Sequence, residues 1–210
     1  RKRYHVFSLD EETMGEELDL KDAAIGIGES NGMLYIDVYT NNFVLSEDIG
    51  SDILSSRDSD SCVGCVFRGR KGDGKYIWGA FHVSLDNFDE KIRCVAQGIK
   101  NFSKGDIDTI ECALTMYEQE KLARIEALFE DCGLTLIVNT HLATISRSSV
   151  LLTRDGTAAG ITVHFETFGM TDAKIKVWDD EKAAAPAEPM GKSRQNRNVP
   201  ISPPPYNTLY

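Results

Sequence analysis

Two thiols and one imidazole lie on a pair of apolar segments joined by a short glycine-containing turn. Cys62 and Cys65 belong to the first segment, Ser61–Phe67, and His82 ends the second, Trp78–His82. Adjacent strands place residues of the same face about 5 Å apart, so a cysteine of the first segment can reach the histidine of the second. A thiol beside an imidazole is the requirement for an activated cysteine nucleophile.

A third polar group would be needed to hold the imidazole ring, and the serines just ahead of Cys62 could supply it. Backbone N–H groups at the corner where the loop enters the strand could stabilise an oxyanion. The serines belong to Ser55–Ser61, which is polar throughout and predicts an exposed loop. These residues together indicate nucleophilic catalysis on a carbonyl group.

The spacing Cys62-x-x-Cys65 also permits a zinc site or a redox pair. Zinc needs two further ligands, for which His82 and His141 are the nearby candidates. A thioredoxin-like pair needs the motif at the start of a helix. Here it lies in a strand pattern, where residues three apart point to opposite faces.

Composition limits the class of partner. The chain has 210 residues and a formal net charge of −10, which disfavours general binding to nucleic acid or to anionic membranes. No apolar run reaches the ~18 residues of a membrane span. The cysteines number five, an odd count, and Cys94, Cys112 and Cys132 fall in apolar patterns that predict buried thiols.

The periodicity of apolar residues predicts two helices and a set of strands. Helices are expected over 88–102 and 118–132, the second ending at Gly133 in the C′ position. The list of expected strands is 4–9, 33–39, 62–67, 75–85, 107–116, 134–138, 150–153, 160–165 and 174–178. Strands followed by alternating helices and strands indicate an α+β fold, a mixed β-sheet sandwich with helices packed on it.

The chain after Trp178 has a different composition. Residues 179–210 contain all six prolines and few apolar residues, which predicts a disordered tail. Near its end, Pro203, Pro204, Pro205 and Tyr206 form the Pro-Pro-x-Tyr pattern that WW domains bind. The final residues also fit a Tyr-x-x-Leu sorting pattern.

The hairpin and the elements after it resemble the CheD family of chemoreceptor glutamine deamidases. The resemblance is carried by Ser61-Cys62-Val63 and by Gly79-Ala80-Phe81-His82 on the returning strand, and the later order of helices and strands is similar. It covers roughly residues 55–166. We therefore expect residues 1–54 to complete the same domain, 55–178 to form a CheD-like core, and 179–210 to be the tail.

The resemblance implies a cysteine hydrolase that converts a protein glutamine to glutamate without metal or cofactor. Cys62 would attack the carboxamide and His82 would protonate the leaving ammonia. The family's threonine falls on Ser56 if Cys62 is the nucleophile and on Ser59 if it is Cys65. Cys62 keeps the local Ser-Cys-Val match, whereas Cys65 keeps the spacing to His82, and we favour Cys62.

The implied partner is a protein that carries the target glutamine. Related Cys-His deamidase folds occur in bacterial toxins that modify host proteins, so the expected location is the cytoplasm or the cytosol of a host cell. The chain begins at Arg1 without methionine, which leaves secretion open. The rival hypothesis is a catalytically inactive CheD-like module that presents the Pro203–Tyr206 tail to WW-domain or sorting partners.

Overall fold

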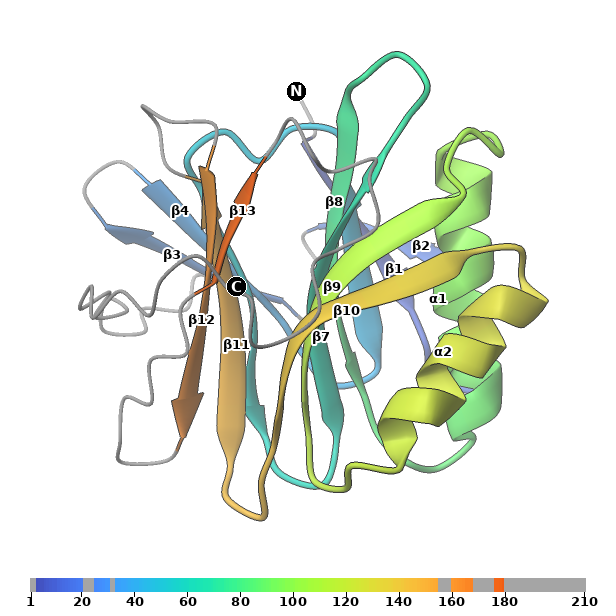
Figure 1. Ribbon diagram of the computed structural model, residues 1–210, viewed down its shortest axis with the longest axis vertical. Helices are drawn as coiled ribbons and strands as arrows, with labels where there is room; N and C mark the ends of the chain where they lie inside the picture. Colours follow the sequence, from blue (N-terminus) through green and yellow to red (C-terminus); the bar gives the residue numbers. More distant parts are fainter. Residues whose placement is uncertain (1–2, 21–24, 31–32, 155–159, 168–175, 180–210) are drawn as a thin grey trace.

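The computed structural model describes residues 3–20, 25–30, 33–154, 160–167 and 176–179. It contains two β-sheets and two helices arranged in three layers (Figure 1). The helices α1 (Phe88–Phe102) and α2 (Lys121–Asp131) cover one face of the first sheet, and the second sheet lies against its other face. The expected α+β sandwich with helices packed on it is confirmed.

The first sheet has seven strands in the order β10-β9-β7-β8-β5-β1-β2. The strands are β1 (Tyr4–Ser8), β2 (Glu17–Leu18), β5 (Asn42–Ser46), β7 (Val63–Arg70), β8 (Tyr76–Val83), β9 (Thr109–Met116) and β10 (Thr135–Ala143). β9 and β10 are parallel and are connected through α2, whereas β7 and β8 form an antiparallel hairpin. The predicted hairpin is therefore at the centre of this sheet.

The second sheet has six strands in the order β13-β12-β11-β6-β4-β3. The strands are β3 (Ile25–Ser30), β4 (Met33–Val38), β6 (Ile53–Ser59), β11 (Ser148–Arg154), β12 (Gly160–Thr167) and β13 (Lys176–Asp179). β4 and β6 are parallel neighbours, and β6 also pairs with β11 in the antiparallel sense. The candidate site lies where β4 and β6 of this sheet meet the β7–β8 hairpin of the first sheet.

The two helices form because each has one apolar face. Phe88, Ile92, Val95 and Ile99 recur at helical spacing and are all buried against the first sheet. α2 ends just before Gly133, which takes φ 78° and donates its N–H to the Glu130 carbonyl. The predicted helix bounds are confirmed for α1, whereas α2 begins three residues later and ends one residue earlier than expected.

The polar segment Ser55–Ser61 was expected to be an exposed loop, and that prediction is wrong. Most of it belongs to β6, and Ser55 and Ser56 are fully buried. The Ser55 hydroxyl is satisfied, because its Oγ donates to the Ile36 carbonyl at 3.0 Å. Ser56 is buried against Gly64, which has no side chain to exclude it. The strand expected over 134–138 extends to Ala143, so His141 lies within β10.

None of the described helices is long and apolar enough to cross a membrane. The tail predicted to be disordered over 179–210, with the motif Pro203, Pro204 and Tyr206, lies outside the described ranges except for Asp179, which ends β13.

Candidate functional site

The register of the β7–β8 hairpin decides which side chains share a face. Gly64 pairs with His82, and Cys65 pairs with Phe81. Because side chains alternate along a strand, the first pair faces one side of the sheet and the second pair faces the other. Cys65 and Phe81 belong to the core beneath the helices, so His82 faces the second sheet.

Cys65 is a core residue. Its side chain is 1% exposed and its thiol lies 3.6 Å from the Val66 carbonyl. Burial raises the pKa of the Cys65 thiol well above its ordinary value. Cys65 therefore has neither the access nor the ionisation that a nucleophile needs.

Cys62 lies in the bend immediately before β7 and is half-buried. Burial raises the pKa of its thiol, the Lys91 ammonium lowers it, and the Asp60 and Asp86 carboxylates raise it. Lys91 is itself buried, and its Nζ donates to Ser84 Oγ at 2.8 Å. The thiol is thus accessible and lies close to a fixed positive charge.

His82 is 4% exposed on β8 and neutral at pH 7. Burial lowers the pKa of His82 from 6.5 to about 4, against the opposing effects of a hydrogen bond with the Val38 backbone and of the Asp58 charge. The Val38 hydrogen bond raises the pKa of His82, as expected when a ring N–H donates to a backbone carbonyl. Nδ1 of the ring has no hydrogen-bond partner among the described residues.

Ser56 lies over Gly64. A Cβ added at Gly64 would lie 2.7 Å from Ser56 Oγ and 2.8 Å from Ser59 Oγ. Since Gly64 pairs with His82, both serines are close neighbours of the histidine across the space between the sheets. Both hydroxyls are buried, with no partner in the part of the chain that the structure describes.

The predicted residues Ser56, Cys62 and His82 all lie near Gly64, but no hydrogen bond joins a cysteine to the histidine in the described part of the chain. Ser56 and His82 are both next to Gly64, and Cys62 lies two residues before it. No hydrogen bond joins Cys62 or Cys65 to the His82 ring within the described ranges. The thiol of Cys62 and the imidazole are both held in their neutral forms.

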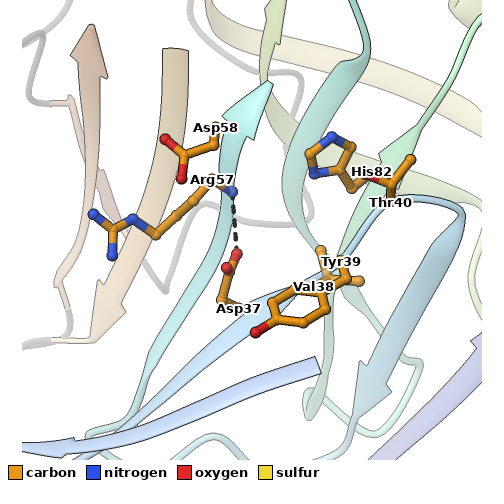
Figure 2. A pocket seen from close by; sticks show the side chains of 7 residues that line it. All are labelled: Asp37, Val38, Tyr39, Thr40, Arg57, Asp58 and His82. Carbon is orange, nitrogen blue, oxygen red and sulfur yellow. Dashed lines mark hydrogen bonds between the residues drawn. The ribbon is translucent and has the colours of Figure 1, made fainter. Parts of the chain in front are cut away.

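A pocket of about 490 Å³ opens beside His82 (Figure 2). It is lined by Asp37, Val38, Tyr39, Thr40, Arg57, Asp58 and His82. Sequence reasoning found only the histidine of this set. A carboxylate in the otherwise apolar run before Val38 was a usable signal for Asp37, whereas nothing local marks Asp58.

No group of three or more His, Cys, Asp or Glu side chains suited to a metal ion occurs among the residues described. His141, considered as a zinc ligand with Cys62 and Cys65, instead lies 3.0 Å from the Gln119 amide.

Comparison with solved structures shows a likeness in fold. The C-terminal domain of CNFy from Yersinia pseudotuberculosis superposes with a TM-score of 0.50 at 11% identity, over 84% of this chain and 87% of that chain. This chain shares the fold of that domain. No protein-family model and no curated protein matches the sequence, so the likeness to the CNFy domain concerns the fold alone.

Proposed function

We propose that this protein is a protein-glutamine deamidase in which Cys62 is the nucleophile and His82 the acid–base group. The observation that carries the proposal is His82, a buried histidine with an unpartnered Nδ1 beside an open pocket. The residues that resemble the CheD family lie at the same corner, and the fold shared with the CNFy domain is consistent with that resemblance.

In the first step the Cys62 proton passes to His82 as the sulfur attacks the substrate. The thiolate attacks the glutamine carboxamide carbon, the C–N bond breaks, and His82 returns the proton to the departing ammonia. Water then hydrolyses the thioester to glutamate and the free thiol. Ser56 is the polar group that would orient the ring, because its hydroxyl lies against Gly64.

The neutral thiol and imidazole define the resting state. Burial opposes charge on both groups, so deprotonation of Cys62 has to accompany substrate attack. The bend that carries Cys62 must also bring the sulfur to the ring when substrate binds, since no hydrogen bond joins them at rest in the described part of the chain.

The test is ammonia release from a library of glutamine-containing peptides by the full chain. Cys62→Ala should abolish release, and His82→Gln should lower it by about 10²–10⁴-fold. Cys65→Ala is the matched control and should keep activity. A Cys62→Ala protein that releases ammonia as fast as wild type would overturn the proposal.

The C-terminal motif supports a second proposal that does not depend on catalysis. Pro203, Pro204 and Tyr206 fit the pattern recognised by WW domains, in which a polyproline II segment presents an aromatic anchor. In this alternative the folded domain is an inactive module that presents its tail to a partner. The two proposals are separated by the ammonia assay and by tail-peptide binding.

A further inference from the structure

The pocket beside His82 has the features of a binding site in its own right. Its volume of about 490 Å³ is in the range that holds a side chain or a small ligand. It is bounded by the end of β4, the turn after it, β6 and β8. The lining combines the apolar side chain of Val38 and the ring of Tyr39 with the polar side chains of the other lining residues (Figure 2).

Two carboxylates line this pocket. Asp37 is 5% exposed on β4, and its Oδ1 accepts the Arg57 backbone N–H at 3.1 Å. That bond, drawn in Figure 2, holds the Asp37 carboxylate between β4 and β6. Asp58, the second, is exposed to solvent.

Asp58 is held at the pocket by a β-bulge. On β11, Ser148 pairs with Ser59 and Val150 pairs with Ser56, so two β6 residues oppose Ser149. Asp58 takes φ 55°, a left-handed conformation that is uncommon outside glycine, and its N–H donates to Ser149 Oγ at 2.9 Å. Strained backbone of this kind persists where the surrounding structure fixes it and is frequent at binding sites.

Arg57 lines the same pocket and offsets only part of its negative charge. Its guanidinium lies 3.9 Å from Glu166 and 5.5 Å from the centre of the Tyr35 ring. Figure 2 shows the Arg57 side chain directed away from His82. The lining contains the two carboxylates of Asp37 and Asp58 and the single guanidinium of Arg57, so it keeps one negative charge in excess.

His82 provides the independent sign of a ligand. His82 is 4% exposed and lines the pocket, and its Nδ1 has no partner among the described residues. A ring whose N–H donates to the Val38 backbone presents Nδ1 as a lone pair. The pocket therefore offers acceptors on three sides, which suits a ligand rich in hydrogen-bond donors.

We propose that this pocket binds the cationic side chain of a lysine or arginine that flanks the target glutamine of the protein substrate. The aliphatic stem would lie on Val38 and Tyr39, and the charged head between Asp37 and Asp58. The assignment rests on the proposed deamidase function, because it makes the flanking residue a determinant of substrate choice.

The experiment compares the binding of three glutamine peptides that differ only in the flanking residue, which is lysine, arginine or norleucine. Norleucine keeps the aliphatic stem of lysine without its charge. Wild-type full chain should bind the lysine and arginine peptides about tenfold tighter than the norleucine peptide, by titration calorimetry. The ratio of the lysine to the arginine affinity identifies which cation fits better.

Two substitutions at Asp58 remove the carboxylate while tolerating the φ of 55°. Asp58→Asn keeps the shape of the side chain, and Asp58→Gly relieves the backbone strain. Both should lose most of the tenfold preference, because only the Asp37 carboxylate then remains beside the charged head. Asp73→Asn, an exposed carboxylate of the β7–β8 turn, is the matched control for net charge and should keep the tenfold preference.

The outcomes separate this inference from the proposed function. Equal binding of the three peptides by wild type, or a tenfold preference that is undiminished in both Asp58 variants, would overturn the inference even if ammonia is released. A preference that depends on Asp58 in a protein that deamidates none of the peptides would support the pocket and contradict the deamidase proposal.

Discussion

Cys65 and His82 point to opposite faces of the seven-stranded sheet, because Cys65 pairs with Phe81 whereas His82 pairs with Gly64. The spacing along the chain favoured Cys65 as the partner of the histidine, and the alternation of side chains places it in the helical core instead. Cys62, two residues before Gly64, is the thiol left at the His82 corner. Its surroundings can be tested without a substrate.

Lys91→Met should slow the alkylation of Cys62. Lys91 is a buried cation whose charge lowers the pKa of the Cys62 thiol, so its removal should reduce the thiolate fraction. We expect the iodoacetamide rate at Cys62, followed by peptide mass spectrometry at pH 7.5, to fall roughly three- to tenfold. Lys100→Met is the control on the same helix, since Lys100 pairs with Asp108. An unchanged rate in Lys91→Met would show that the lysine does not act on this thiol.

Gly64→Ala should destabilise the protein by about 1–3 kcal/mol, the usual cost of overpacking. The added Cβ would lie 2.7 Å from Ser56 Oγ and 3.1 Å from Thr115 Cγ2, both buried between the sheets. Urea unfolding followed by circular dichroism measures the loss. The comparison is Gly72→Ala in the exposed turn, where the new Cβ meets only the Asp106 carboxylate at 3.0 Å and the change should be within about 0.5 kcal/mol. Equal losses in the two variants would contradict the packing described for Gly64.

The elements that the sequence predicted correctly are those with a local signal. Phe88, Ile92 and Ile99 mark the buried face of α1 by their spacing alone, and the glycine-containing turn marks the β7–β8 hairpin. Both are set by residues close together in the chain. The pairing of Cys62 with His82 stays a prediction, because no hydrogen bond joins the two side chains among the described residues.

β6 and the pocket could not be read from the chain because long-range partners determine them. Ser55 is buried because the Ile36 carbonyl accepts its hydroxyl, 19 residues away in sequence. Asp58 reaches the pocket because Ser149, 91 residues away, holds the bulge. A polar stretch with such partners forms a buried strand, whereas the same stretch without them would remain a loop.

A peptide covering residues 197–210 should bind WW domains, and Tyr206→Ala should weaken that binding at least about tenfold. Tyr206 is the aromatic anchor of the motif, so its removal takes away the main side-chain contact with the WW domain. The prolines favour the extended polyproline II conformation before binding. Fluorescence anisotropy against a panel of WW domains gives the affinities. A Tyr210→Ala peptide, altered outside the motif, is the control. Equal binding by the wild-type and Tyr206→Ala peptides would remove the tail from the interaction hypothesis.

Stability should fall as the pH is lowered from 7 to 4.5, and His82 should account for a defined part of the loss. The pKa of His82 is lowered from 6.5 to about 4 by burial, so between these values the unfolded chain binds a proton that the folded chain does not. Acid therefore favours the unfolded state across this window. The histidine alone should remove about 2 kcal/mol of unfolding free energy between pH 7 and pH 4.5.

Comparison with His82→Gln isolates this contribution, because other groups titrate equally in both proteins. Urea unfolding at the two pH values should show the wild type losing about 2 kcal/mol more than the variant. The difference lies in the pH dependence, so an overall destabilisation by the substitution does not obscure it. If the two proteins lose the same unfolding free energy, His82 takes up a proton in the folded state as readily as in the unfolded state. The description of His82 as a buried neutral ring, on which both the deamidase proposal and the pocket depend, would then be wrong.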